Sequence, residues 1–228
     1  MQRLGLLGGT FDPIHNGHLQ CALAVAKQMQ LDQVALLPNA LPPHKATPGV
    51  SPQQRLAMVE LACAPYPQLS VDGRELARAG HSYTVDTLAE MRAEQPQRQL
   101  YFIIGMDSLL SFPQWHQPQQ ILALCHLLVC PRPGYTLPND GAVSDLLARH
   151  QITCAAQLQQ QPHGAIFLVD APLFDVASST LRQQLQQPDH SRLMDLPPPV
   201  AAYICEQRLY DAKTDTPTKP FCRNSHRN

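Results

Sequence analysis

The stretch Gly8-Gly9-Thr10-Phe11-Asp12-Pro13-Ile14-His15-Asn16-Gly17-His18 decides the fold, because it joins a predicted strand to a predicted helix. Before it, the apolar run 3–7 is long enough for one buried parallel strand. After it, apolar residues recur at helical spacing from Leu19 to Met29, which predicts a helix that begins near Asn16 or Gly17. The first N–H groups of such a helix are unpaired and partly positive, so this loop offers a site for phosphate.

The loop itself has the chemistry of a phosphate cradle. His15 and His18 are three residues apart, so both can face the helix start, and Gly8 and Gly9 let a ligand approach the backbone. The two common fingerprints, G-x-G-x-x-G and G-x-x-x-x-G-K-[ST], do not fit. Two histidines at this spacing could also bind a metal or cap a helix. The surrounding glycines and Pro13, which stiffens the turn, favour phosphate.

Composition restricts the protein class. A chain of 228 residues suits one domain, which we expect over residues 1–210, followed by a polar and disordered tail over residues 211–228. The net charge of −1 argues against nucleic acid as a partner, since nucleic-acid-binding domains usually carry a basic excess. The ligand should therefore be small.

Cysteine usage and hydropathy predict a compartment. Seven cysteines form no C-x-x-C pair, which suits free thiols in a reducing environment and no structural zinc. The apolar run near the start is too short for a secretory signal, and no stretch approaches the length of a membrane span. We therefore expect a cytoplasmic protein that does not bind membranes.

Six apolar runs read as strands, and they alternate with helical patterns. The strands are expected at residues 3–7, 33–37, 69–71, 99–104, 126–130 and 165–169. Helices are expected at residues 52–63, 140–150 and 198–210, and two more are expected to begin after residue 84 and at residue 178. In the helix at 52–63, the positions in helical register are Leu56, Val59, Glu60 and Cys63. The alternation predicts an α/β fold, a Rossmann-like doubly wound and mostly parallel sheet flanked by helices.

Five of the six strands are followed by polar loops at one edge of this sheet, where ligands bind in open α/β folds. After the second strand come His44 and Lys45, and after the fourth comes Asp107, which could accept from ribose or cap a helix. Arg132 follows the fifth strand. The sixth is followed by Ser178-Ser179-Thr180-Leu181-Arg182, which is either a second anion site or a capped helix beside a solvated arginine.

Two further features stand outside these loops. Ser82 and Thr84 are candidate N-caps of the helix that follows them. Trp115 is the only tryptophan, and it lies in a segment rich in proline and glutamine. It is either a core residue or a platform on which a ring could stack.

The sequence as a whole resembles a known family. Residues 9–18 match the G-x-F-x-P-x-H-x-G-H signature of nucleotidyltransferases. Residues 178–182 look like its S-[ST]-x-x-[IL]-R partner with one position fewer, with leucine before the arginine and Ala177 in place of the usual isoleucine. Further segments narrow the resemblance to the bacterial nicotinate-nucleotide adenylyltransferases, over residues 3–210. These segments are Pro42-Pro43-His44-Lys45, Ser82-Tyr83-Thr84, Gly105-x-Asp107-Ser108, Phe112-Pro113-x-Trp115 and Arg132-Pro133-Gly134-Tyr135.

The resemblance implies a reaction and a set of site residues. The 5′-phosphate of nicotinate mononucleotide would attack the α-phosphorus of ATP, giving deamido-NAD and pyrophosphate, with Mg²⁺ held mainly by the ATP phosphates. The catalytic residues would be His15, His18, Lys45 and Arg182. ATP would be bound by Gly8, Gly9, Thr10, Phe11, His18, Gly105, Asp107, Arg132, Ser178, Ser179, Thr180 and Arg182. Nicotinate mononucleotide would be bound by His15, Lys45, Tyr83, Thr84 and Trp115.

Other functions remain open from the sequence. Another nucleotidyltransferase of the superfamily, with a phosphopantetheine or glycerol-3-phosphate acceptor, would share both anion sites but not Tyr83, Thr84 and Trp115. A nucleotide-binding sensor without turnover would have no need of both histidines, Lys45 and Arg182 together. A metal-binding protein is the third alternative. The oligomeric state is not predicted.

Overall fold

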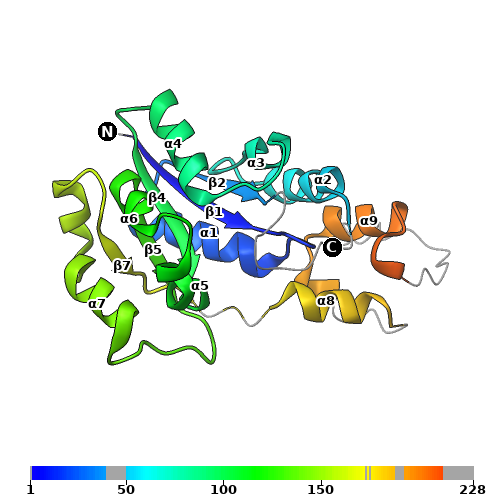
Figure 1. Ribbon diagram of the computed structural model, residues 1–228. Coiled ribbons are helices and arrows are strands. Elements are labelled where there is room, and N and C mark those ends of the chain that lie inside the picture. The colour runs from blue at the N-terminus through cyan, green and yellow to red at the C-terminus, as the bar shows by residue number, and fades with distance from the viewer. Residues whose placement is uncertain (1, 40–49, 173, 175, 188–192, 213–228) are drawn as a thin grey trace, which may run out of the picture.

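The fold is a single parallel sheet with helices on both faces (Figure 1). The computed structural model describes residues 2–39, 50–172, 174, 176–187 and 193–212. The strands within these residues are β1 (Arg3–Gly9), β2 (Gln33–Pro38), β3 (Leu69–Val71), β4 (Gln99–Gly105), β5 (His126–Cys130), β6 (Gln151–Ile152) and β7 (Ile166–Leu168). They lie in the order β3-β2-β1-β4-β5-β7-β6, and every described pair is parallel.

Helices connect these strands. The α-helices are α1 (Asn16–Met29), α2 (Pro52–Cys63), α3 (Arg74–Ala77), α4 (Thr84–Glu94), α5 (Met106–Ser111), α6 (Pro118–Leu124), α7 (Gly141–His150), α8 (Ser178–Leu185) and α9 (Pro198–Glu206). The short 3-10 helices are η1 (Phe112–Gln114), η2 (Ala155–Gln160), η3 (Leu193–Asp195) and η4 (Leu209–Asp211).

The inner strands are apolar on both faces, because each face is covered by helices. In β4, Tyr101 and Ile103 pack into the hydrophobic cluster that includes α1, α2, α8 and α9. The alternate residues Leu100 and Phe102 pack on the opposite face into the cluster that includes α4, α5, α6 and α7. A continuous run of buried residues is therefore the expected pattern for β4, whose first six residues are all buried.

The strand order reverses between β1 and β4, which lie side by side in the middle of the sheet. From β1 the chain moves outward through β2 to β3, and it then returns past β1 to β4 and continues to the other edge. The carboxyl ends of two strands that diverge in this way leave a crevice in which ligands bind in doubly wound folds. The loop after β1 and the residues after β4 are placed at this point.

The predicted α/β architecture is confirmed, with three corrections. The sheet has seven described strands rather than six, because β6 adds a two-residue edge strand that pairs with β7. All described strand pairs are parallel, where the sequence predicted a mostly parallel sheet. The last predicted helix ends at Glu206 and is followed by η4. The predicted tail lies outside the described residues from residue 213, so the boundary at residue 210 stays a prediction.

Two expectations drawn from composition can be compared with the described residues. The cysteines at positions 21, 63, 125, 130, 154 and 205 are all free thiols, and Cys222 lies outside the described part of the chain. None of the described helices is both long and apolar enough to cross a membrane.

Candidate active site

The loop between β1 and α1 places its two histidines against each other. His15 is the residue before α1, and its ring stacks on the ring of His18, with centroids 3.6 Å apart and planes 23° apart. Phe11 meets His18 edge-on at 5.0 Å and adopts a left-handed backbone with φ of 48°. Gly17 makes room for this stack, because a Cβ there would lie 3.1 Å from Nδ1 of His15. The predicted helix start is thus confirmed, and the two histidines lie side by side at it.

The hydrogen bonds of this loop indicate where His18 carries its proton. The backbone N–H of His15 donates to Nδ1 of His18 at 3.3 Å. A neutral imidazole whose Nδ1 accepts must carry its hydrogen on Nε2. His18 therefore presents an N–H donor on the side of the ring away from the helix cap.

His15 is held in its neutral form. Only 4% of this residue is exposed, and burial lowers its pKa from 6.5 to about 4, with the positive charge of Arg132 as a second cause. Within the described residues its Nδ1 has no hydrogen-bond partner. This atom is covered by the start of α1, where the His15 side chain and the His18 backbone face each other in a capping box.

The second predicted anion site lies directly against this loop. The hydroxyl of Ser178 at the start of α8 donates to the carbonyl of Pro13 at 3.0 Å, and Nη1 of Arg182 donates to the carbonyl of Asp12 at 2.6 Å. Ser179 and Thr180, in the same first turn, are exposed. The two sites are more than 160 residues apart in the chain, and the fold brings them together as the sequence predicted.

Asp12 joins the loop to the end of the described chain. Its carboxylate is almost fully buried, accepts a hydrogen bond of 2.6 Å from the hydroxyl of Tyr210 in η4, and lies 3.7 Å from Nη1 of Arg182. Burial and the negative charge of Asp12 raise the pKa of Tyr210 well above its usual range. Tyr210 therefore stays a hydrogen-bond donor at neutral pH.

The residues that follow β4 and β5 form a second group of candidate site residues. Arg132 donates from Nη1 to both carboxylate oxygens of Asp107, each at 3.1 Å. Asp107 lies in the first turn of α5 and folds back over the end of β4, where a Cβ at Gly105 would lie 2.5 Å from its Oδ1. This glycine is needed for the close approach. Arg132 is half exposed, and its positive charge is the second cause of the lowered pKa of His15.

The start of α4 adds aromatic side chains. The residue before the helix is Tyr83, whose ring lies 4.3 Å from that of His116, and its side chain makes no bond to the helix start. Ser82 and Thr84 are therefore not the N-cap, which corrects the prediction. Trp115 packs against Phe102 and Phe112, but it is only half buried. It therefore has features of both predicted alternatives, a core residue and a partly exposed ring.

The remaining predicted residues are placed as follows. Gly8 and Gly9 end β1, and the carbonyl of Thr10 accepts from a buried arginine, Arg55. Lys45, for which both a catalytic and a binding role were predicted, lies outside the described residues, as does His44.

Arg55, Asp12 and Tyr210 are residues that the sequence interpretation missed. Arg55 is fully buried in α2 and donates to the carbonyls of Thr10 at 2.6 Å and Asn39 at 2.8 Å, so it supports the loop from below. A signal was present, because Arg55 is in register with Met58, Val59 and Ala62, which form the actual inner face of α2. The predicted register through Leu56 and Glu60 was wrong by one position.

The donor set of the site suits phosphate better than a bare metal. Among the described residues no cluster of three or more histidine, cysteine or acidic side chains is placed to hold a metal ion. Instead the loop presents imidazoles and a helix start, and Arg132 and Arg182 contribute guanidinium groups from after β5 and from α8. These groups donate hydrogen bonds or carry positive charge, and both suit anionic oxygens.

Comparison with known proteins identifies the family of this chain. Residues 6–184 match the model of the cytidylyltransferase-like family. A probable nicotinate-nucleotide adenylyltransferase of Aeromonas hydrophila is 47% identical over 207 residues, which cover 91% of this chain and 96% of that protein. The corresponding protein of Pectobacterium atrosepticum is 48% identical over 205 residues, covering 89% and 96%.

A solved structure supports the fold independently. The nicotinic acid mononucleotide adenylyltransferase of Plasmodium falciparum, in complex with NaAD, superposes with a TM-score of 0.70 at 15% identity, covering 93% of this chain and 99% of that one. The sequence matches extend over most of the chain, and the family match over residues 6–184 includes the loop after β1 and residues 178–182. The chain therefore belongs to the cytidylyltransferase-like family and, within it, to the nicotinate-nucleotide adenylyltransferases.

Proposed function

We propose that this protein transfers the AMP moiety of ATP to the 5′-phosphate of nicotinate mononucleotide, which gives deamido-NAD and pyrophosphate. The observation that carries the proposal is the stacked pair His15 and His18 at the start of α1, next to the start of α8. The names of relatives that are 46–48% identical to this chain support the choice of acceptor.

The reaction brings two negatively charged phosphates together, so the main task of the protein is to hold them and to stabilise the charge that develops. We assign His18, through its Nε2–H, to the α-phosphate of ATP. His15, which is held neutral and stacks on His18, is assigned to the phosphate of the acceptor. Arg182 and Lys45 would neutralise phosphate charge. Ser178, Ser179 and Thr180 would donate hydrogen bonds through their backbone N–H groups at the start of α8, since the Ser178 hydroxyl already donates to Pro13.

In this proposal the adenosine and the nicotinate nucleoside bind at different parts of the site. The adenosine ribose would be held by Asp107 beside Gly105, and Arg132 would lie next to the ATP phosphates together with residues 8–11. The nicotinate ring would lie near Trp115 and Tyr83, with its carboxylate at the first N–H groups of α4, beginning with Thr84. The absence of a side-chain bond from Tyr83 to the start of α4 supports this placement.

Mg²⁺ fits this site as a partner of ATP rather than of the protein. The imidazoles and guanidinium groups of the site suit phosphate oxygens, so the ion would be held mainly by the ATP phosphates and water, as is usual for Mg²⁺. Bound there, it would neutralise phosphate charge. The protein groups would then orient the two phosphates for attack.

Pyrophosphate release tests the proposal. We expect release with ATP and nicotinate mononucleotide, and little with CTP or with phosphopantetheine or glycerol 3-phosphate as acceptor. Preference for either of those acceptors would assign the chain to a different activity of the superfamily. If none of the acceptors gives pyrophosphate release, catalysis is contradicted and a nucleotide-binding sensor is favoured.

A further inference from the structure

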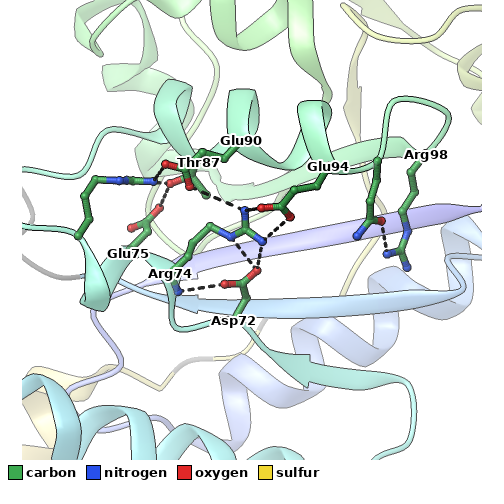
Figure 2. Close-up of polar contacts among 9 residues, drawn as sticks. Asp72, Arg74, Glu75, Thr87, Glu90, Glu94 and Arg98 are labelled. Atoms are coloured by element: carbon green, nitrogen blue, oxygen red, sulfur yellow. Dashed lines mark hydrogen bonds and ion pairs between the residues drawn. The ribbon is translucent and has the colours of Figure 1, made fainter.

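A polar cluster lies between α3 and α4, and the proposed function does not use it. Figure 2 shows side chains from the end of β3, from α3 and from α4 that point toward one another across the gap between the two helices. We call it the α3–α4 cluster, and its members are Asp72, Arg74, Glu75, Arg78, Thr87, Glu90 and Glu94.

Arg78 connects this cluster to the segment that precedes α4. Its Nη1 donates to the hydroxyl of Ser82 and, at 3.3 Å, to Oγ1 of Thr87, while Nη2 lies 2.8 Å from Oε1 of Glu90. Ser82 and Thr87 are both buried, so these bonds form away from bulk water. Ser82 directly precedes Tyr83, and Arg78 therefore fastens the last residues before α4 to the body of the helix.

A buried carboxylate makes this arginine harder to replace. The hydroxyl of Thr87 donates to Glu75 at 2.8 Å, and only 6% of Glu75 is exposed. Burial raises the pKa of Glu75, while the hydrogen bond from Thr87 and the charge of Arg78 act in the opposite direction. One guanidinium group thus compensates the carboxylate and holds Ser82 at the same time.

Arg74 belongs to the same cluster and provides a natural comparison. It donates from Nε to Asp72 at 2.9 Å and from Nη1 and Nη2 to Glu94, each at 3.0 Å. Its side chain is as exposed as that of Arg78, at 21% against 20%. Both arginines form an ion pair with Glu90. Arg74 otherwise bonds to Asp72 and to Glu94 at the far end of α4, whereas Arg78 bonds to Ser82 and Thr87 near its beginning.

We infer that Arg78 is a positioning residue for the nicotinate nucleotide, because it holds Ser82 against α4 and so fixes the backbone at Tyr83 and Thr84. The inference rests on the proposed function, in which this backbone receives the ring carboxylate. Arg78 acts through Ser82 and does not need to touch the substrate. It should therefore influence the affinity for one substrate and not the other.

The test compares Arg78→Met with the matched control Arg74→Met in the full-length protein. We expect Arg78→Met to raise KM for nicotinate mononucleotide by about tenfold, the size of effect expected when a positioned hydrogen bond is lost, and to change KM for ATP by less than about twofold. Arg78→Lys should recover part of this loss, since it keeps the charge but donates in fewer directions. Arg74→Met should leave both KM values within about twofold of wild type, even if it lowers Tm as much.

Ser82→Ala keeps the inference testable if Arg78→Met does not fold. This change should raise KM for nicotinate mononucleotide by about threefold alone and should have a smaller effect in the Arg78→Lys background if the two residues act through one bond. An unchanged KM in Ser82→Ala, or equal changes for both substrates in Arg78→Met, would overturn the inference. If the wild-type protein itself releases no pyrophosphate with nicotinate mononucleotide, the proposed function fails, and the inference fails with it.

Discussion

At the scale of single residues, His18 is the group that the geometry most clearly prepares for donation. Its Nδ1 already accepts from the backbone of His15, and its ring is held between His15 and Phe11. We expect His18→Ala to fold normally and to lose about 10²–10³-fold in kcat, the usual effect of removing one preorganised donor to transition-state charge. Steady-state kinetics and Tm check this, and a variant within about threefold of wild-type kcat would remove His18 from the chemistry.

His15 makes a different prediction, which concerns stability against pH. Its pKa falls from 6.5 in the unfolded chain to about 4 in the folded protein, and that of buried His126 falls to the same value. As pH drops below 6.5, the unfolded chain binds protons that the folded protein does not, so the free energy of unfolding decreases. The decrease continues to about pH 4, with a slope of up to about 1.4 kcal/mol per pH unit for each histidine.

Urea denaturation between pH 7 and pH 4 measures this slope. His15→Gln should remove the contribution of one histidine and make the slope shallower by up to about 1.4 kcal/mol per pH unit. His126→Gln serves as a parallel variant outside the proposed site. An unchanged slope in His15→Gln would show that His15 is not kept neutral by the fold.

At the scale of elements, the start of α4 should distinguish two closely related acceptors. A ring carboxylate can accept from several backbone N–H groups, whereas the amide of nicotinamide mononucleotide must turn its NH₂ toward at least one of them. The unpaired donor costs about 1–3 kcal/mol, and the lost charge–dipole attraction adds up to about 2 kcal/mol. We expect kcat/KM to favour nicotinate mononucleotide by about 10²–10³-fold.

Measuring kcat/KM for both nucleotides at fixed ATP decides this prediction. A ratio below about ten would show that the start of α4 does not recognise the carboxylate.

The elements were largely predictable from the sequence, whereas several contacts between them were not. The strand at 99–104 and the helix after Gly17 follow from apolar runs and helical spacing, which depend only on local sequence. The pairing of α8 with the first loop followed from the rule that carboxyl ends of parallel strands meet at one edge. The two-residue strand β6 is too short to give a periodic pattern, so it was not predicted.

Each missed side chain has its own physical reason. Arg55 was overlooked because arginine is usually exposed, although its position in the inner register of α2 gave a signal. Asp12 and Tyr210 meet only through tertiary folding, and their separation of 198 residues leaves no trace in local pattern. Ser82 looked like a helix cap, and its actual partner, Arg78, belongs to the preceding segment.

At the scale of the whole molecule, the bond between Tyr210 and Asp12 should support the active-site loop from the far end of the chain. Tyr210→Phe removes one donor to a buried carboxylate, and we expect unfolding free energy to fall by about 1.5–3 kcal/mol, with a loss of kcat because Asp12 also faces Arg182. Tyr203→Phe on neighbouring α9 is the matched control and should change stability by about 0.5 kcal/mol or less.

Urea denaturation and steady-state kinetics measure both effects. A Tyr210→Phe variant with wild-type stability and kcat would mean that the loop is held without the end of the chain. Equal losses in Tyr210→Phe and Tyr203→Phe would instead assign the effect to packing around α9.

The same long-range bonds set an order of events during synthesis. The partners of the loop follow it by 165 residues at Ser178, 170 at Arg182 and 198 at Tyr210. At about 5–20 residues per second, a ribosome needs about 8–40 s to reach them after the loop has been made. During that time Asp12 lacks both its tyrosine and its arginine. The nascent chain therefore cannot complete the proposed phosphate site, and we expect no ATP consumption, until residue 210 has been translated.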